Sequence, residues 1–217
     1  MSKRIFVTAT NTNVGKTYTS KQLIKALFAL GLRVGVFKPI ETGVENFPLD
    51  GKELFDTACR YNPALHSLSI NDIVPLQFPL PAAPFVANQG ESVDLSVFDA
   101  PLAKIEALCD VVIIEGAGGL FVPIDKQTMM IDFPRYFNAV TLLVTHCNLG
   151  CINDTLLSAK ALSDNDYRFI LGFNCRADDE TFEKTSLPYL NHRFGSIYRI
   201  DHDIDVIAKA LLDTIST

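Results

Sequence analysis

Short apolar runs recur along the chain, and each is closed by a polar or turn-forming residue. Within a run nearly every position is apolar, so hydrophobicity does not alternate with a period of two. Such runs are typical of strands that are buried on both faces of a sheet. They predict strands at residues 4–9, 33–38, 110–116, 139–145, 168–173 and 194–200.

Stretches with a helical period separate these runs. The clearest is 16–33, where Leu23, Ile24 and Leu27 begin an apolar stripe and Gly31 provides the stop. Weaker helical patterns cover 51–61, 94–108, 151–163, 179–193 and 203–215. The proline-rich segment 74–90 is too apolar for a flexible linker and is expected to be ordered and extended.

The alternation of strands and helices predicts a doubly wound α/β domain with a mostly parallel sheet. The chain has 217 residues and is 48% hydrophobic, which suits one sizeable core, so a single domain over 1–217 is expected. Ligands of such domains bind beyond the carboxyl ends of the strands. The loops that follow the predicted strands are therefore the places to look for chemistry.

Charge and targeting patterns narrow the possible partners. A net charge of −6 argues against a nucleic-acid partner, whose phosphates require a basic face. The amino terminus lacks the long apolar core of a signal peptide, and no stretch approaches the roughly 20 apolar residues of a membrane span. We expect a cytoplasmic protein without a membrane partner.

The five cysteines, Cys59, Cys109, Cys147, Cys151 and Cys175, are scattered and lie mostly in apolar runs. This distribution suits reduced core thiols better than a disulfide framework. Cys147 and Cys151 could share a helix face, but no second pair of Cys or His residues stands at ligand spacing. A zinc site is therefore not expected.

The stretch FVTATNTNVGKT, residues 6–17, joins the first predicted strand to the first predicted helix. Its ending, Gly15-Lys16-Thr17, is typical of a phosphate-binding loop, in which backbone N–H groups and a lysine hold phosphates and the hydroxyl binds Mg²⁺. A chance match at the head of a solvated helix is the alternative. The order of strand, turn and helix favours the phosphate site, although Thr10 stands where a Walker loop has glycine.

An acid and a glycine-rich stretch end the predicted strand in VVIIEGAGG, residues 111–119. Glu115 takes the place from which nucleotide-binding sheets present a carboxylate, more often an aspartate, to Mg²⁺. The glycines allow a ligand to approach the backbone closely. A simple turn at a strand end is the alternative, and the pairing with the first loop favours a nucleotide site.

Two further loops follow predicted strands. In VFKPIETG, Lys38 is either a solvated strand end or a second cation that joins Lys16 and Glu115 at one sheet edge, beside a transferring phosphoryl group. In THCNLGCIND, Gly150 leads into a predicted helix whose free N–H groups could hold a carboxylate or phosphate. By itself this last pattern is only a capped helix start.

Together these stretches resemble the dethiobiotin synthetase family of P-loop enzymes. The family loop G-T-x-T-x-V-G-K-T is matched through Thr17, with Ala9 in place of the leading glycine. Ala9 is expected to have a negative φ, because its methyl group disfavours the left-handed region. The motif K-P-x-x-[ST]-G is matched from Lys38 to Gly43, V-E-G-A-G-G from Glu115 to Gly119 after Ile114, and L-G-C-I-N from Leu149 to Asn153.

The resemblance implies a P-loop NTPase-like fold and a homodimer that uses Mg²⁺, ATP, carbon dioxide and diaminopelargonic acid. One amine of the diamine captures carbon dioxide as a carbamate, which accepts the γ-phosphoryl group to form a mixed anhydride. The second amine attacks the anhydride carbon, closes the ring and expels phosphate. Positioning and charge neutralisation are expected to dominate this catalysis.

The resemblance also assigns roles to residues. Lys16 and Lys38 would be catalytic, because they neutralise the transferring phosphoryl group and the carbamate. Thr17 and Glu115 would hold magnesium with an acid of the next helix, for which Asp56 is the first choice and Glu53 and Asp50 are alternatives. The nucleotide would contact Asn13, Val14, Gly15, Lys16, Thr17, Tyr18, Glu115, Gly116, Ala117, Gly118 and Asn174. The substrate would contact Thr42 and, across the dimer interface, Gly150, Cys151, Ile152 and Asn153.

The carboxyl third departs from the family pattern. Gly172 to Arg176 stands where relatives tend to have G-x-x-x-N, and Gly195 to Ile200 where they tend to have G-x-I-P-W-L. These stretches contact the nucleotide base in relatives. ATP is therefore expected to serve, with loose discrimination against other nucleoside triphosphates.

Three rival functions fit the sequence less well. A partitioning or septum-positioning ATPase switch would carry K-G-G-x-G-K-[ST], with a lysine where this chain has Asn11. A ligase acting on cobyrinic acid would normally carry a glutaminase domain, for which 217 residues leave no room. A non-catalytic nucleotide-binding module would give Lys38 and Thr42 no role.

Overall fold

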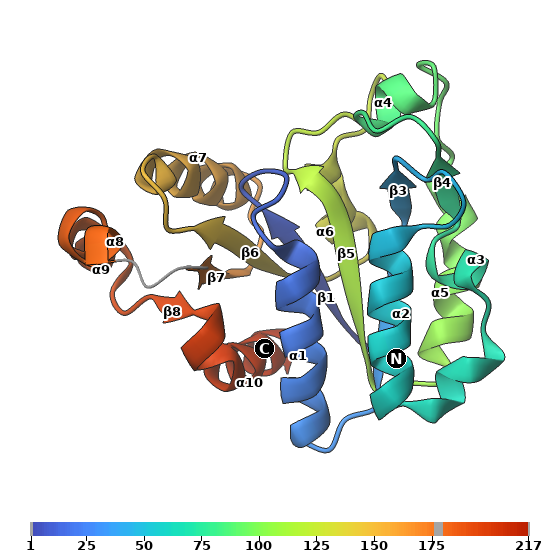
Figure 1. Ribbon diagram of the computed structural model, residues 1–217, viewed down its shortest axis with the longest axis horizontal. Coiled ribbons are helices and arrows are strands. Elements are labelled where there is room, and N and C mark those ends of the chain that lie inside the picture. Colours follow the sequence, from blue (N-terminus) through green and yellow to red (C-terminus); the bar gives the residue numbers. More distant parts are fainter. Residues whose placement is uncertain (1, 176–179, 217) are drawn as a thin grey trace.

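The computed structural model describes residues 2–175 and 180–216. A central sheet with the strand order β2-β5-β1-β6-β7-β8 runs through the molecule (Figure 1). Neighbouring strands in this sheet are parallel, which confirms the predicted architecture. The strands are β1 (Lys3–Ala9), β2 (Val34–Phe37), β5 (Val111–Gly119), β6 (Val140–His146), β7 (Phe169–Asn174) and β8 (Tyr198–Arg199).

Helices cover both faces of the sheet (Figure 1). In front, α1 (Lys16–Ala29) packs between α2 (Leu49–Tyr61) and α10 (Ile200–Ser216). Behind lie α5 (Asp99–Glu106), α6 (Phe133–Tyr136) and α7 (Cys151–Asp164). The shorter elements are α3 (Ile70–Ile73), α4 (Pro84–Ala87), α8 (Glu180–Thr185), α9 (Leu187–Phe194) and 3-10 turns at Pro63–Ser67, Leu95–Phe98 and Met130–Asp132. Within the described ranges, no helix combines the length and the apolar content that crossing a membrane requires.

The core follows from the uninterrupted apolar strands. The central strands β1 and β5 are fully buried from Ile5 to Val7 and from Val111 to Ile114. On one side, Phe37 packs edge to face on Phe98 and Phe137, with ring centroids 6.2 Å and 6.0 Å apart. Each fully buried side chain of this size contributes about 1.5–3 kcal/mol by leaving water. The packing holds the carboxyl ends of the strands at one edge.

Several elements differ from the sequence prediction. The separate parallel pair β3 (Ile40–Thr42) and β4 (Leu76–Phe78) was not predicted. The strand expected at 194–200 is reduced to β8, because α9 continues to Phe194 and α10 begins at Ile200. The helix expected at 179–193 is divided into α8 and α9 before Pro188, and residue 179 lies outside the described ranges. The helix expected at 94–108 is a 3-10 turn followed by α5.

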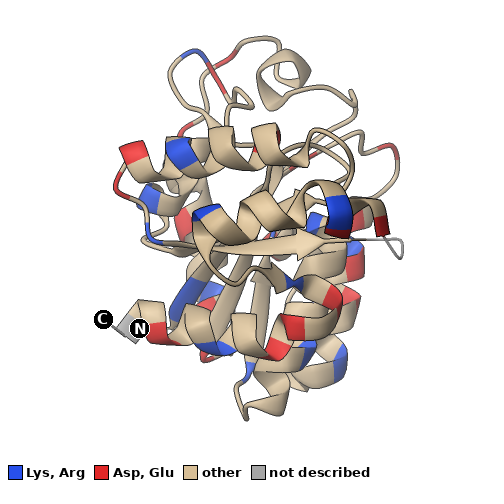
Figure 2. Ribbon diagram, turned by 90° about the vertical axis from the view of Figure 1, so that its left-hand side faces the viewer, with Lys and Arg blue, Asp and Glu red and all other residues tan. Residues whose placement is uncertain are grey.

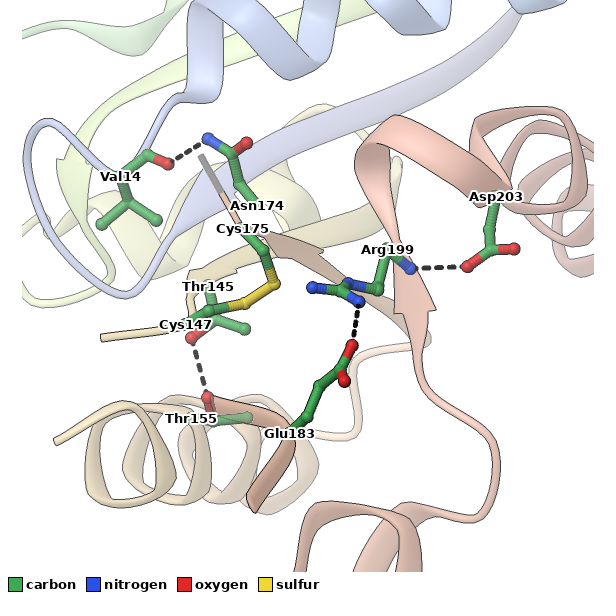
Figure 3. Close-up of a disulfide and its surroundings, with 9 residues drawn as sticks. All are labelled: Val14, Thr145, Cys147, Thr155, Asn174, Cys175, Glu183, Arg199 and Asp203. Atoms are coloured by element: carbon green, nitrogen blue, oxygen red, sulfur yellow. Dashed lines mark hydrogen bonds and ion pairs between the residues drawn. A yellow bond between two sulfur atoms is a disulfide. The ribbon is translucent and has the colours of Figure 1, made fainter. Parts of the chain in front are cut away.

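A disulfide joins Cys147 and Cys175 just beyond the ends of β6 and β7 (Figure 3). Their Cα atoms are 5.0 Å apart. The expectation that every cysteine is reduced was therefore wrong for this pair. Because β6 and β7 are adjacent and parallel, residues that follow their carboxyl ends are neighbours although 28 positions separate them. Cys59, Cys109 and Cys151 are free and buried.

The surface carries both signs of charge. Figure 2 shows basic residues next to acidic residues on the face over α7 to α9, without one dominant patch. Pairs of opposite charge lie one helical turn apart on this face, Lys160–Asp164 at 2.9 Å and Lys184–Glu180 at 3.0 Å, and also on α2, Lys52–Asp56 at 2.7 Å. Exposed pairs contribute about 0–1 kcal/mol each. The fold therefore depends on its core rather than on these pairs.

Candidate active site

The loop between β1 and α1 presents a helix N-terminus at the carboxyl edge of the sheet. Gly15 precedes α1 with φ 104°, a left-handed conformation that favours glycine, and no side chain caps the helix there. The first N–H groups of α1 are thus available to an anion. Asn13 also has a positive φ, 60°, whereas Ala9 does not, as predicted.

Lys16 is buried at the start of α1. Its Nζ donates to the carbonyl oxygen of Gly118 at 2.8 Å and to that of Asn11 at 3.4 Å. Burial and the nearby charge of Lys38 lower the pKa of Lys16 to about 8. An anionic ligand would offset both effects, so this position favours a phosphate.

Glu115 has no exposed surface and is the centre of the site. Its Oε1 accepts hydrogen bonds from Thr17 Oγ1 at 2.9 Å and from Lys38 Nζ at 2.8 Å. Its Oε2 accepts one from Ser20 Oγ at 2.7 Å. A buried carboxylate requires partners of this kind. Ser20 was not predicted as a site residue, although its place one turn after Thr17 on the same helix is a usable signal.

Lys38 directly follows β2 and is 3% exposed. Besides Glu115, its Nζ faces Asp50, whose Oδ2 lies 3.6 Å away. Burial opposes the charge of Lys38, but the carboxylates of Glu115 and Asp50 outweigh burial and raise its pKa above the ordinary value. Lys38 is thus a fixed cation of the site, not a solvated strand end.

A cavity of about 750 Å³ opens at this edge, a volume typical of small-molecule sites. Its walls include these residues that the sequence predicted for ligand binding: Asn13, Gly15, Lys16, Thr17, Tyr18, Lys38, Thr42, Ala117 and Gly118. The proline-rich segment supplies an unpredicted wall from Pro81 to Pro84. The pairing of β3 with β4 holds that wall beside Thr42.

The structure does not bring Asp56 to the cavity. Its side chain is exposed and pairs with Lys52 at 2.7 Å. Because α2 begins at Leu49, its first turn meets the cavity, and the two alternative acids, Asp50 and Glu53, line the wall. Asp56 stands about 9 Å further along the helix axis than Asp50.

Four predicted nucleotide contacts are not among the residues that line the cavity: Val14, Glu115, Gly116 and Asn174. Asn174 Nδ2 donates to the carbonyl oxygen of Val14 at 2.7 Å (Figure 3). The Oδ1 of Asn174 is buried and accepts no hydrogen bond from the described residues. Gly116 packs against Phe6 and Met130, which a Cβ would approach to 2.9 Å and 3.0 Å. Arg176, in the departing motif, lies outside the described residues.

The start of α7 also lies away from the cavity. Gly150 precedes this helix with φ 96°, and Cys151, the first helical residue, is buried. Asp154 Oδ2 is bonded to His146 Nε2 at 3.0 Å. None of the predicted substrate-tail residues Gly150 to Asn153 lines the described cavity. Within one chain, therefore, this helix start and the phosphate loop do not form one site.

Sequence relatives were found over nearly the full chain. Residues 3–194 match a family model described as an AAA domain. The ATP-dependent dethiobiotin synthetase of Sulfurovum sp. is 39% identical over 95% of this chain and 99% of its own length. The enzyme of the same name from Wolinella succinogenes is 34% identical over 98% of this chain and 100% of its own length. The one from Helicobacter pylori is 35% identical over 86% of this chain and 87% of its own length.

Solved structures share the fold at much lower identity. A plasmid partition protein from Borrelia burgdorferi has a TM-score of 0.60 at 11% identity and covers 98% of this chain and 99% of its own. A ParA family ATPase from Chlorobium tepidum has a TM-score of 0.52 at 17% identity, and the match covers 99% of this chain and 91% of the ATPase chain. These two likenesses concern the P-loop type of fold alone. On the sequence relatives, the chain belongs to the dethiobiotin synthetase family.

Proposed function

We propose that this protein is an ATP-dependent dethiobiotin synthetase that works in the cytoplasm. It would carboxylate diaminopelargonic acid with carbon dioxide and close the ureido ring, releasing ADP and phosphate. The observation that carries the proposal is that Lys16, Lys38 and Thr42 line one cavity, while buried Glu115 accepts hydrogen bonds from Lys38 and from Thr17 of the same wall. A phosphate loop alone would suit many ATPases, whereas the added cation and hydroxyl suit transfer to a second substrate.

The triphosphate would lie over the N-terminus of α1. Lys16 now donates to backbone carbonyl oxygens, which are weaker acceptors than a phosphate, so its ammonium group can exchange partners when ATP binds. Lys38 is held near the same place by Glu115 and Asp50. Two fixed cations would neutralise the charge that develops on the transferred phosphoryl group.

Magnesium fits the oxygen atoms of this site. Mg²⁺ prefers oxygen ligands and is usually held by one or two carboxylates together with substrate phosphates. Thr17, Glu115 and Asp50 supply a hydroxyl and two carboxylates around Lys38, and we propose Asp50 in place of Asp56. When bound, the metal would neutralise phosphate charge.

The diamine and its carbamate would occupy the cavity between Thr42 and the proline-rich wall. The hydroxyl of Thr42 can hold the carbamate by hydrogen bonding, while Lys38 balances its negative charge. The side chains would thus align the carbamate oxygen with the γ-phosphoryl group and then the second amine with the anhydride carbon. This is catalysis by positioning and charge neutralisation.

We further propose that a homodimer completes the substrate site. The N-terminus of α7 suits the tail carboxylate of the diamine, but it lies outside the cavity of its own chain. Apolar side chains just before this helix and on it are exposed, Leu149 by 95% and Leu157 by 61%, and Phe121, which follows β5, is exposed by 64%. A second copy that covers them would bring its own α7 to the cavity of the first.

The test is phosphate release from Mg-ATP and bicarbonate in the presence and absence of diaminopelargonic acid. We expect release that depends on the diamine, together with one dethiobiotin per phosphate. Equal release without the diamine would support an ATPase switch instead. No release would support the non-catalytic binding module. A parallel competition between ATP and GTP tests the prediction of loose base selection, which strong ATP preference would refute.

A further inference from the structure

Glu41 makes a contact that the proposed reaction does not use. Its side chain is buried, 7% exposed, in β3 between Lys38 and Thr42. Oε1 accepts a hydrogen bond from the backbone N–H of Asp50 at 2.9 Å. Oε2 accepts one from the backbone N–H of Gly51 at 2.8 Å. Both oxygens of one carboxylate thus hold the first turn of α2.

The first turn of α2 depends on this carboxylate because the helix has no cap of its own. Pro48 occupies the N-cap position, where serine, threonine, asparagine or aspartate would offer a side-chain oxygen, and no side-chain cap bond is made. The orphan N–H groups of Asp50 and Gly51 are satisfied by Glu41 instead, from a strand that precedes the helix. The negative charge also lies at the positive end of the helix dipole.

The fit around this carboxylate is tight. A Cβ on Gly51 would lie 2.1 Å from Val74 Cγ2 and 3.2 Å from Glu41 Oε2. Glycine therefore lets the turn approach both the core and the carboxylate. Since Leu54 and Ala58 anchor the rest of α2 in the core, loss of the Glu41 bonds would release the first turn rather than the whole helix.

The first turn is the part of α2 that reaches the active site. Asp50 belongs to it, and the Asp50 carboxylate faces Lys38 Nζ at 3.6 Å while its side chain remains 54% exposed. Held by its own N–H, Asp50 can direct its carboxylate toward a ligand without reorganisation of the backbone. The same bond fixes the distance between α2 and β3, the two elements on either side of the cavity wall.

We propose that Glu41 is a positioning residue, which clamps the first turn of α2 and so aims Asp50 at the magnesium site. The inference rests on the proposed function, because it takes Asp50 as a metal ligand. A carboxylate is required, since the amide of Gln would bring an NH₂ group against one of the two backbone N–H donors. An aspartate is one methylene shorter and cannot keep both bonds in the present backbone geometry.

The experiment measures Mn²⁺, an EPR-visible substitute for Mg²⁺, bound to the full-length protein in the presence of a non-hydrolysable ATP analogue. Wild type is compared with Glu41→Gln and Glu41→Asp. Removal of a group that orients a metal ligand lowers metal affinity by roughly 10–100-fold, and we expect that loss here. Affinity for the analogue without metal should stay unchanged, because Lys16 and the phosphate loop are not altered.

Two controls separate positioning from general stability. Glu106→Gln weakens the ion pair with Arg4, neither of which lines the cavity, and should lower thermal stability without changing Mn²⁺ affinity. In an Asp50→Asn background, Glu41→Gln should cause no further loss of Mn²⁺ affinity, since it acts through Asp50. If Glu41→Gln does not fold, Glu41→Asp carries the same comparison.

The Mn²⁺ affinities separate failure of this inference from failure of the proposed function. Wild-type Mn²⁺ affinity in a folded Glu41 variant would overturn the inference and leave the proposed function standing. A full further loss in the Asp50→Asn background would also overturn it, since Glu41 would then act independently of Asp50. Wild-type protein that binds no Mn²⁺ with the analogue would refute the proposed metal site, and the inference with it.

Discussion

The helices α1 and α7 begin in the same way but carry different chemistry. Each has 14 residues, follows one of two adjacent parallel strands, and starts after a glycine in the left-handed region, Gly15 or Gly150. At α1 the glycine is followed by Lys16 and Thr17, which line the cavity. At α7 the glycine is followed by buried Cys151 and exposed Asn153, and neither residue lines the cavity.

A helix N-terminus becomes a site only through the side chains around it. The α1 start has partners in β5 and in the segment after β2: Glu115 accepts hydrogen bonds from Thr17 and Lys38, and Lys16 donates to the carbonyl oxygen of Gly118. The α7 start is anchored instead, by the bond between Thr145 and Thr155 and by the disulfide next to it (Figure 3). We interpret α1 as a complete phosphate site and α7 as half of a site.

The largest effect is expected from Lys16→Ala, which would reduce α1 to the bare helix start seen at α7. Loss of a fixed charge that stabilises a transition state lowers kcat by about 10²–10³-fold. Steady-state phosphate release measures the loss. Lys25→Ala, on an exposed position of the same helix, is the matched control and should be neutral. Near-normal turnover in Lys16→Ala would show that the backbone alone holds the phosphates.

The next largest effect is expected from removing the disulfide beside α7. Removing a native disulfide costs about 2–4 kcal/mol of unfolding free energy. Cys147→Ser should therefore unfold at lower urea concentration than wild type under oxidising conditions and match wild type in excess dithiothreitol. Cys59→Ser, at a free buried thiol, is a control whose stability should not depend on dithiothreitol. A Cys147→Ser variant with wild-type stability under oxidising conditions would contradict a stabilising bond.

Leu149→Glu tests whether a second copy of the chain completes the half-site at the start of α7. A charge in the centre of an apolar interface should raise the dimer dissociation constant about tenfold or more, equal to at least 1.4 kcal/mol. Sedimentation velocity gives the constant, and turnover should then need higher diamine concentrations while nucleotide binding stays normal. Val206→Glu, at an exposed apolar position on α10, is the control. Unchanged sedimentation would place any dimer contact elsewhere.

The smallest effect is expected from Asp154→Ala. The change removes the bond to His146 and an acidic charge in the first turn of α7. Both groups are partly exposed, so the loss should be about 0.3–1 kcal/mol. Urea unfolding measures it, with Asp164→Ala near the far end of the helix as the comparison. A loss above that range would mean that this helix start depends on the pair more than its exposure implies.

The sequence could predict the parallel sheet and the residues that converge at its edge. Continuous apolar runs imply strands covered on both faces, and parallel strands bring the residues after Ala9, Phe37 and Ile114 together. Hence Lys16, Lys38 and Glu115 could be grouped without a structure. The negative φ of Ala9 followed from its methyl group, and the structure confirms it.

Other features depend on contacts that no local pattern contains. The disulfide requires that β6 and β7 be neighbours, which spacing along the chain does not reveal. Asp50 and Asp56 differ only in their distance from the start of α2, and that start depends on Glu41, a residue outside the helix. Short strands such as β3 and β4 pair through tertiary packing rather than through hydrophobic periodicity.

We propose that the α1 site of one protomer works with the α7 start of the other. Mixing two separately inactive variants, Lys16→Ala and Asn153→Asp, tests this directly, because the second variant places a negative charge where the substrate carboxylate would bind. In a symmetric dimer one of the two sites of each mixed dimer is intact, so about a quarter of wild-type turnover should return after subunit exchange. Mixed dimers that form and stay inactive would contradict the claim.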